Sequence, residues 1–469
     1  MGLLGEMAMV GAARWMAAAG LVALYAALCA AVWWRERRKL RVAQAQAASL
    51  AAAREGLHAL LVVYASQTGQ AQELAEETAR LLHAAGEPVQ LCPVDQLTPE
   101  ALAQAQFALW VVSTCGEGDP PDHAAAFASH ILASAPQLAH LRYGLLALGD
   151  RQYTHFCGFG RQVDAWLQRC GATCLFDTVE MDNGDVKALQ QWQHHLGQVA
   201  HVSDLPAWQA PEFANWVLAR RTHLNPGSAG GAVFHLELAP PADLADPAGA
   251  ASAWESGDLV QVRAPQDPDH PREYSVASIA SDGGVHLLVR QAVRGDGSLG
   301  LASGWLTQGA AVGAAIPLRL RVHSNFRLEG NAQRPLILIG NGTGLAGLRA
   351  HLRARAAVGA GPHWLLFGER NAAYDFHHQA ELEGWRRQGT LQRLDVAFSR
   401  DQPARVYVQH LLAAEADTVR AWVAQGAAVY VCGSLQGMAQ AVDSTLRQIL
   451  GADALDHLLR EGRYRRDVY

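Results

Sequence analysis

The hydrophobic and polar positions follow three different patterns along the chain. Residues 15–34 form an uncharged run of twenty, about the length of a helix that crosses the hydrocarbon core of a bilayer. From residue 59 short apolar runs alternate with helical patterns, which is typical of a parallel sheet covered by helices on both faces. From residue 232 short alternating runs between Pro, Gly and Asp turns indicate an antiparallel barrel. The alternation of strands and helices returns at residue 335.

These changes of pattern predict the domain boundaries. We expect an N-terminal segment with a transmembrane helix over residues 1–34, a stalk over 35–58, a doubly wound parallel α/β domain over 59–200, a linker over 201–231, a barrel over 232–330 and a second α/β domain over 331–469. Five basic residues follow the apolar run closely, whereas Arg14 alone precedes it. The positive-inside rule then predicts a single-pass protein of the cell (inner) membrane, with its large domains in the cytoplasm.

The first α/β domain carries an anion site at its first strand. Residues 60–64 are an apolar strand, residues 66–71 a hydroxyl-rich turn with Gly69, and a helical pattern follows. Backbone N–H groups and hydroxyls converge at such a turn, and the helix dipole favours a phosphate. No Lys follows the turn, so it is not a nucleoside-triphosphate loop, and a monophosphate fits better.

Two further loops leave the same edge of the predicted sheet, where ligands of doubly wound sheets bind. The loop at residues 115–121 is rich in Gly and Pro and can bring backbone groups close to a planar ligand. The loop that begins at Asp150 carries Tyr153 and Phe156, which are candidates for stacking on a ring. Together the three loops predict a site for a planar, phosphorylated ligand.

The barrel carries the motif Arg-Glu-Tyr-Ser at residues 272–275. An Arg can grip a pyrophosphate, an aromatic ring can cover an isoalloxazine and a small hydroxyl can approach its reactive nitrogen, so the motif can serve a flavin. Alone, it also fits an exposed strand with one cross-strand pair. Residues 300–303, at an expected helix start, offer N–H groups and a hydroxyl to a second phosphate.

The second α/β domain opens with an apolar strand at residues 335–339 and a Gly-rich turn at 340–344. A helical pattern follows the turn, and this order favours a pyrophosphate. A later strand is followed by two cations and two hydroxyls, from Ser399, Arg400, Arg405 and Tyr407. Such groups suit the 2′-phosphate of NADPH, whereas a carboxylate would suit the ribose of NADH. Asp401 supports NADH, but the four neighbouring side chains favour NADPH.

The three loops of the first α/β domain resemble the FMN loops of the flavodoxin-like domain in diflavin reductases. This family includes NADPH–haemoprotein reductases and the sulfite reductase flavoprotein. Cys115 departs from the family pattern, because NADPH–haemoprotein reductases have a flavin-stacking aromatic residue there, and Tyr153 is left as the main stacking residue. The resemblance implies that FMN is bound by Ser66, Gln67, Thr68, Gly69, Gln70, Ala71, Ser113, Thr114, Cys115, Gly116, Glu117, Gly118, Leu148, Gly149, Asp150, Tyr153, Phe156 and Cys157.

The rest of the chain resembles the ferredoxin–NADP reductase module of the same family, an antiparallel FAD barrel followed by an α/β NADP domain. The terminal segment at residues 463–469 is especially close to the sulfite reductase flavoprotein. The resemblance implies that FAD is bound by Arg272, Tyr274, Ser275, Leu288, Val289, Arg290, Gly300, Ala302, Ser303 and Tyr469. It implies that NADPH is bound by Gly342, Thr343, Gly344, Ser399, Arg400, Arg405, Tyr407, Gln409 and Cys432.

The resemblance also implies four catalytic residues at the reacting rings. Ser275 would hydrogen-bond the flavin nitrogen, Cys432 and Asp467 would orient the nicotinamide, and Tyr469 would cover the flavin face and swing aside. Cys432 also fits a core thiol, and Tyr469 also fits a frayed terminus. Two departures from the family are Gly347, where a Pro is common, and residues 257–272, which leave no space for the helical connecting domain of larger members.

The function expected from the resemblance is a membrane-anchored NADPH-dependent diflavin reductase. It would pass electrons from NADPH to FAD, then to FMN and then to an acceptor such as a haem protein. A flavoprotein component of sulfite reduction and an inner-membrane ferric-siderophore reductase fit as well. An FMN electron carrier with a degenerate reductase module and a structural adaptor are the non-enzyme alternatives. The acceptor, a protein or a ferric chelate, stays open.

Composition argues against two other classes of protein. A formal net charge of −6 over 469 residues gives no indication of nucleic-acid binding. Seven cysteines, an odd number, argue against a disulfide framework and for a reducing compartment. Cys170 and Cys174 have the spacing of zinc ligands, but no second pair accompanies them, so we expect buried thiols and no metal site.

Overall fold

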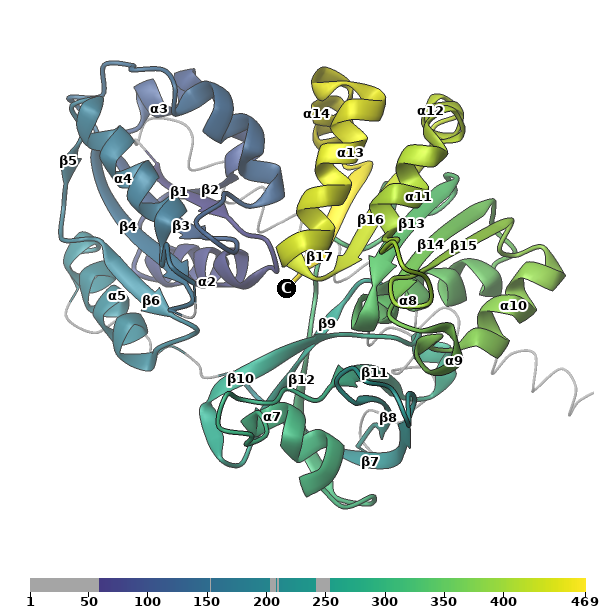
Figure 1. The fold of residues 1–469 in the computed structure, drawn as a ribbon. Helices are drawn as coiled ribbons and strands as arrows, with labels where there is room; N and C mark the ends of the chain where they lie inside the picture. The colour runs from purple at the N-terminus through teal and green to yellow at the C-terminus, as the bar shows by residue number, and fades with distance from the viewer. Residues whose placement is uncertain (1–58, 152, 203–207, 209–210, 242–253) are drawn as a thin grey trace, which may run out of the picture.

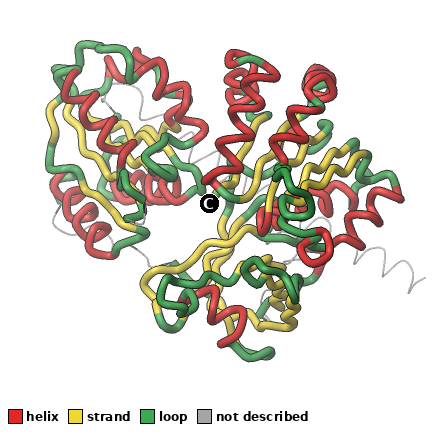
Figure 2. Tube along the Cα trace, viewed as in Figure 1, coloured by secondary structure: helices red, strands yellow, loops and turns green. Residues whose placement is uncertain are grey.

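The structure is a computed structural model that describes residues 59–151, 153–202, 208, 211–241 and 254–469. The described residues form three sheets, and each sheet is the centre of one domain (Figure 1). In both α/β domains the strands lie between helices, whereas the barrel consists mainly of strands and loops (Figure 2). The C-terminus lies where the three domains face one another (Figure 1).

The first α/β domain is a parallel sheet with the strand order β2-β1-β3-β4-β5, and β6 pairs with β4. The central strands are apolar at nearly every position because helices cover both faces. Successive residues of β1 therefore enter two different cores: Val62 packs on the side of α2 and α5, and Val63 on the side of α3 and α4. The elements are β1 (Leu60–Ala65), α2 (Gln70–Ala84), β2 (Val89–Pro93), α3 (Pro99–Gln104), β3 (Phe107–Ser113), β4 (Arg142–Gly149), α4 (Gly158–Arg169), β5 (Thr173–Cys174), β6 (Val179–Asp182) and α5 (Val186–Val199).

The barrel is an antiparallel sheet with the strand order β10-β9-β12-β7-β8-β11. It begins at β7, inside the stretch expected to be a linker, because Trp216 and Leu218 enter the core while the residues between and after them face outward. The elements are β7 (Ala214–His223), β8 (Val233–Ala239), β9 (Leu259–Ala264), β10 (Asp267–Ser275), β11 (Val285–Arg290), α7 (Leu301–Gly304) and β12 (Ala315–Arg321).

Strands β9 and β10 form a tight hairpin. Ala264 pairs with Asp267, so only Pro265 and Gln266 join the two strands. The hairpin has no room for an inserted domain, in agreement with the short spacing between residues 257 and 272 in the sequence. The Arg-Glu-Tyr-Ser motif consequently lies on a strand that pairs directly with β9.

The second α/β domain is a parallel sheet with the strand order β15-β14-β13-β16-β17. It shares a hydrophobic core with the barrel, in which Leu288 and Phe326 pack with Leu345 and Cys432, so the two domains form one packed unit. The elements are β13 (Leu336–Asn341), α8 (Leu345–Ala357), β14 (His363–Glu369), α9 (Ala372–Asp375), α10 (Gln379–Gln388), β15 (Arg393–Phe398), α11 (Val408–Ala414), α12 (Ala416–Ala424), β16 (Ala428–Gly433), α13 (Gln440–Leu450), α14 (Ala452–Arg460) and β17 (Tyr464–Val468).

The predicted membrane location has to be corrected. In the part of the chain that the structure describes, no helix has both the length and the apolar character needed to cross a bilayer. The predicted membrane helix at residues 15–34 and the stalk at 35–58 lie outside the described residues. The prediction of a single-pass inner-membrane protein has no support among the described helices and is withdrawn, and membrane attachment is not part of the function proposed below.

A substitution at Gly160 can test how closely α4 packs on β4. A Cβ at this position would lie 2.4 Å from Ala147 Cβ. We expect Gly160→Ala to lower the free energy of unfolding by about 1–3 kcal/mol, because the added methyl group forces the helix away from the sheet. Thermal unfolding followed by circular dichroism measures the change.

The control is Gly384→Ala in α10, where the described residues leave a Cβ free of neighbours within 4 Å. Alanine favours a helix interior over glycine by up to about 1 kcal/mol, so this variant should be as stable as the wild type or more stable. Equal melting temperatures for wild type and Gly160→Ala would contradict the close packing.

Candidate functional site

A cavity of about 950 Å³ lies where the second α/β domain, the barrel and the first loop of the first α/β domain meet. Its volume is in the range of sites for cofactors. Thr68 contributes from the first α/β domain and Glu369 and Arg370 from the end of β14. Besides Thr68, twelve lining residues were predicted from the sequence, namely Tyr274, Ser275, Leu288, Arg290, Gly342, Thr343, Ser399, Arg400, Tyr407, Gln409, Asp467 and Tyr469.

Three predicted catalytic residues meet at one side of this cavity. Ser275 Oγ donates a hydrogen bond of 2.6 Å to Asp467 Oδ2, and Cys432 Sγ donates one of 3.5 Å to the same oxygen. All three side chains are buried. Burial, and then the charge of Asp467, hold the pKa of the Cys432 thiol well above its usual range. The group therefore presents a carboxylate held by two protonated donors.

The pairing of β16 with β17 explains this arrangement. Cys432 and Asp467 are partners in the parallel register, so their side chains point to the same face of the sheet. Ser275 reaches them from the end of β10, in the barrel. The shared core between the barrel and the second α/β domain fixes the distance between β10 and β17.

Tyr469 is anchored rather than frayed. Its N–H donates to Gly433 O (3.0 Å), and its carbonyl accepts from Leu435 N–H (3.0 Å). Its hydroxyl lies 3.3 Å from Thr343 Oγ1. The ring is half-exposed at the cavity, where it can cover a planar group.

The glycine-rich turn after β13 brings backbone close to the cavity. Gly342 has φ of 56°, a conformation that favours glycine. A Cβ on Gly344 would lie 2.1 Å from Cys432 O, so no larger residue fits there. The turn leads directly into α8, and this strand–turn–helix order fits a pyrophosphate.

Most of the residues predicted to bind the 2′-phosphate lie together at the cavity. Ser399, Arg400 and Tyr407 line the cavity, and Gln409 joins them. Gln409 Oε1 is buried and has no hydrogen-bond partner among the described residues, as expected of a group that binds a ligand. Arg405 does not line the cavity, and Arg370, which does, was missed because nothing in the local sequence distinguishes it.

Asp401 faces away from this group. Its carboxylate accepts hydrogen bonds from Asn371 Nδ2 (2.8 Å) and Ala372 N–H (2.8 Å), at the start of α9. It therefore caps a helix and does not line the cavity. Asp401 therefore gives no structural support for binding the ribose of NADH.

Several predicted FAD residues lie outside the cavity. Arg272 is 3.7 Å from Asp267, and Ser303 Oγ accepts a hydrogen bond from Ala292 N–H (3.1 Å). Val289 is buried in the barrel core. Gly300 and Ala302 also lie outside the lining, so the FAD roles of these five residues stay predictions.

The three predicted FMN loops meet at the carboxyl edge of the first sheet. The second loop is tied to the ends of the third, because Thr114 N–H donates to Leu148 O (2.9 Å) and Phe159 N–H donates to Thr114 Oγ1 (3.2 Å). Thr154 N–H donates to Glu117 Oε2 (3.0 Å). A single ligand can therefore contact the second and third loops together.

The side chains of these loops differ in what they can offer. Ser66 Oγ is buried and lacks a hydrogen-bond partner within the described residues, which fits a hydroxyl that binds a phosphate. Tyr153 is half-buried at the loop, whereas Phe156 and Cys157 are packed in the hydrophobic core. Cys115 is partly exposed and lies 3.7 Å from Gln67 Oε1. Tyr153 is thus better placed than Phe156 to stack on a ring.

The first loop docks directly on the barrel. Arg321 Nη2 donates to Thr68 O (3.1 Å), and Asn325 Nδ2 donates to Ser66 O (2.7 Å). A second contact joins Arg466 Nε to Asp122 Oδ1 (3.0 Å), between β17 and the first α/β domain. Sequence reasoning missed these pairs because the partners are hundreds of residues apart.

The comparisons with known proteins agree with this geometry. Residues 62–195 match the flavodoxin family, and residues 338–444 match the oxidoreductase NAD-binding domain. The sulfite reductase (NADPH) flavoprotein alpha-component of Vibrio cholerae is 28% identical over 540 aligned residues, which cover 87% of both chains. The corresponding proteins of Yersinia enterocolitica and Bacillus subtilis are 29% and 27% identical, over 87% of this chain and 90% and 89% of theirs.

The chain belongs to the diflavin reductase family. As a diflavin reductase it is an NADPH-dependent flavoprotein oxidoreductase, and its cofactors are FMN, FAD and NADPH. The alignment with the relatives is longer than the 469-residue chain itself, so the relatives contain insertions that this diflavin reductase lacks. The buried Ser66 hydroxyl can donate to a phosphate oxygen of such a cofactor, and the buried Gln409 Oε1 can accept from one of its hydroxyl or amino groups.

The protonation of Cys432 can be tested by alkylation of the flavin-loaded protein. The thiolate is the reactive form, and the raised pKa keeps Cys432 protonated at pH 8. We expect iodoacetamide at pH 8 to modify the exposed Cys174 and to leave Cys432 unmodified, as measured by mass spectrometry of the peptides. Both residues should react in denaturant. Equal rates of modification in the folded protein would contradict the buried thiol.

Proposed function

We propose that this diflavin reductase is the flavoprotein component of a sulfite-reducing system and passes electrons from NADPH through FAD and FMN to a haem protein. The similarity to sulfite reductase flavoproteins over 87% of the chain supports this acceptor. When bound, the cofactors supply hydride transfer and one-electron transfer. The observation that carries the proposal is one cavity that contains Ser275 and Asp467 at one side and Arg400 among its lining.

Ser275, Cys432 and Asp467 are the residues proposed to lie beside the nicotinamide ring. Asp467 holds the hydroxyl of Ser275 and the thiol of Cys432 in place by accepting a hydrogen bond from each. The carboxylate also places a negative charge where a nicotinamide becomes positive as its hydride leaves. Tyr469 would cover the flavin and exclude water from it, and its ring would have to move to admit a nicotinamide.

The selection of NADPH over NADH is assigned to the part of the cavity lined by Ser399, Arg400 and Tyr407. Ser399, Arg400 and Tyr407 would bind the 2′-phosphate, with Gln409 beside them. Arg405, which was predicted to join them, is replaced in this proposal by Arg370, which lines the cavity. The pyrophosphate would lie on the turn formed by Gly342, Thr343 and Gly344.

The two flavins are proposed to lie close together. Tyr274, Leu288 and Arg290 line the cavity on the FAD side, and Thr68 of the first FMN loop lines the same cavity. Arg321 links Thr68 to Glu273, the neighbour of Tyr274. The barrel therefore positions the phosphate loop of FMN next to the FAD motif.

Purified full-length protein tests this proposal. We expect about one FMN and one FAD per chain, and we expect NADPH oxidation to reduce the haem subunit of a sulfite reductase. Cytochrome c and a ferric chelate are the comparison acceptors. A single flavin per chain would contradict the diflavin assignment. Reduction of the ferric chelate without reduction of the haem subunit would contradict the sulfite-reducing role alone.

Removal of Tyr469 tests the proposed cover of the flavin. Without the ring, a nicotinamide can enter regardless of how firmly its 2′-phosphate is held, so the ratio of kcat/KM for NADH to that for NADPH should rise about tenfold or more. Tyr469→Phe keeps the ring and is the control, which should retain the wild-type preference. An unchanged ratio in the deletion variant would contradict the role of Tyr469.

A further inference from the structure

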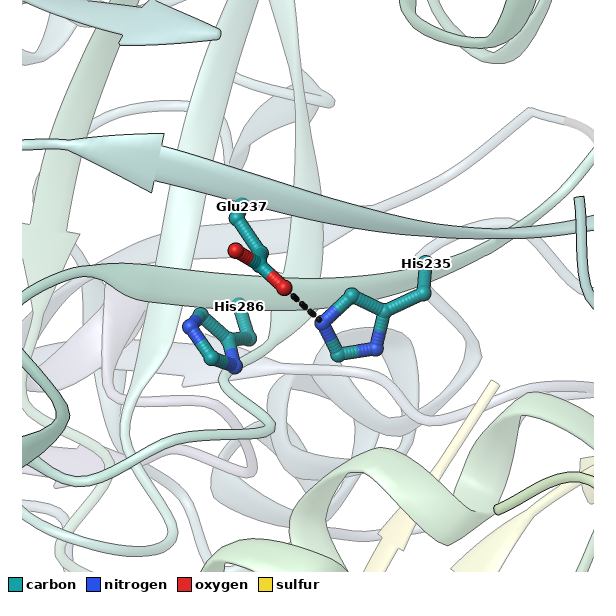
Figure 3. A group of neighbouring side chains, drawn as sticks. All are labelled: His235, Glu237 and His286. Atoms are coloured by element: carbon teal, nitrogen blue, oxygen red, sulfur yellow. Dashed lines mark ion pairs between the residues drawn. The ribbon is translucent and has the colours of Figure 1, made fainter. Parts of the chain in front are cut away.

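Two histidines and a glutamate converge on the outer face of the barrel, away from the cofactor cavity. His235 and Glu237 lie two residues apart on β8, so their side chains share one face, opposite to Leu236 in the core. His286 on β11 is the direct cross-strand partner of Glu237. The two imidazole rings and the carboxylate therefore face a common space (Figure 3).

The distances fit a metal ion. One ligand atom from each of the three residues lies within 4.8 Å of the other two, and His235 Nε2 is 3.5 Å from Glu237 Oε1. Ligands about 2.0–2.1 Å from a tetrahedral zinc ion are roughly 3.3 Å apart. The His235–Glu237 pair already has about this spacing, and the ligand atom of His286 lies within 4.8 Å of both.

Each imidazole can offer the lone pair of one ring nitrogen to a metal ion. His286 Nδ1 is buried without a hydrogen-bond partner in the described part of the chain. An orphaned buried nitrogen is costly unless a ligand or an ion completes the site.

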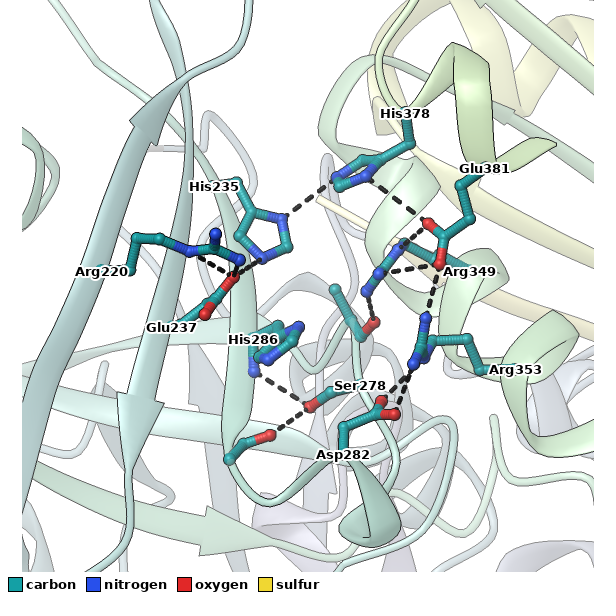
Figure 4. Close-up of polar contacts among 12 residues, drawn as sticks. Arg220, His235, Glu237, Ser278, Asp282, His286, Arg349, Arg353, His378 and Glu381 are labelled. Carbon is teal, nitrogen blue, oxygen red and sulfur yellow. Dashed lines mark hydrogen bonds and ion pairs between the residues drawn. The ribbon is translucent and has the colours of Figure 1, made fainter. Parts of the chain in front are cut away.

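The second α/β domain supplies the outer contacts of this cluster. His235 Nδ1 lies 3.1 Å from His378 Nε2, and His378 Nδ1 lies 3.5 Å from Glu381 Oε2 (Figure 4). If His235 Nδ1–H donates to His378, the lone pair of His235 Nε2 points at the cluster. A hydrogen bond of this kind fixes the tautomer and orientation of metal-binding histidines.

The charges around the cluster are balanced. Arg220 pairs with Glu237, Arg349 with Glu381, and Arg353 with both Glu381 and Asp282 (Figure 4). Arg220 is the competitor for the Glu237 carboxylate, but its side chain is exposed and can turn to solvent. Arg349 and Arg353 are held by acids of their own, so Glu237 is the carboxylate that an incoming cation would take.

We propose that His235, Glu237 and His286 form a binding site for a divalent cation of the zinc class, with water as the remaining ligand. Two imidazoles and a carboxylate suit zinc, whereas magnesium and calcium prefer sets of oxygen atoms. The ion joins β8 to β11 and, through His235 and His378, the barrel to the second α/β domain. The ligands come from two separate strands, which is why the sequence predicted no metal site.

Zinc binding by the flavin-loaded full-length protein tests the proposal. We expect the wild type to take up about one Zn²⁺ per chain against a chromophoric chelator, and Zn²⁺ but not Mg²⁺ to raise its melting temperature. His286→Gln and His235→Gln should weaken zinc binding at least tenfold. Arg220→Ala should strengthen it, because the Glu237 carboxylate loses its competing partner.

The matched control is His457→Gln. His457 on α14 lies 3.3 Å from Glu461 in an exposed pair to which the described residues add no third metal ligand, so its loss should leave the bound zinc unchanged. Equal zinc affinity in the wild type and in both cluster variants would overturn the proposal. A wild type whose melting temperature responds equally to Zn²⁺ and Mg²⁺ would overturn it as well, even if the variants do not fold.

Discussion

The site depends on one buried carboxylate. Asp467 is 4% exposed, and an ionised carboxylate in such a position is strongly unfavourable unless donors surround it. The donors come from two domains: Ser275 belongs to the barrel and Cys432 to the central strands of the second α/β domain. β17 consequently has to pair with β16 in the one register that places Asp467 next to Cys432.

That register determines where the neighbouring residues go. Arg466 points to the opposite face from Asp467 and reaches Asp122 in the first α/β domain. Tyr469 reaches the cavity beside Thr343. One short strand therefore contacts all three domains, and the direct β9–β10 hairpin lets them meet without a spacer between them.

The sequence predicted the fold class and about half of the cavity lining because these depend on local order. A strand, a glycine turn and a helix in succession predict a phosphate loop, and such loops are found at Gly69 and Gly342. Arg370 and Arg321 were missed because their roles depend on which distant strand ends lie opposite them. Strand β7 was missed for a related reason: its two buried residues, Trp216 and Leu218, are separated by the apolar Val217, so no polar alternation marks the strand, and the prolines and glycines around it indicated a linker.

Phe156 shows the other limit of sequence reasoning. An aromatic residue in a loop can stack on a ligand or fill the core, and only the packing of α4 on the sheet places it in the core. The same holds for Asp401, whose carboxylate caps α9 although its neighbours line the cavity. The sequence indicated correctly what each side chain can do, an aromatic ring that packs and a carboxylate that accepts hydrogen bonds. Tertiary contacts decide which partner each side chain meets.

The docking of the first loop on the barrel has a consequence for electron delivery. The contacts that place this loop beside the FAD motif also cover it, so a bulky acceptor has to approach from another side or wait until the domains separate. Two ion pairs also join the first α/β domain to the rest of the chain, Arg466 with Asp122 and Arg319 with Glu73, and they are partly exposed to solvent. Salt screens surface charges, with a Debye length of about 8 Å at physiological ionic strength, and weakens partly exposed pairs of this kind less than fully exposed ones. If the flavins lie as proposed, higher ionic strength should slow transfer between them and ease the access of an external acceptor.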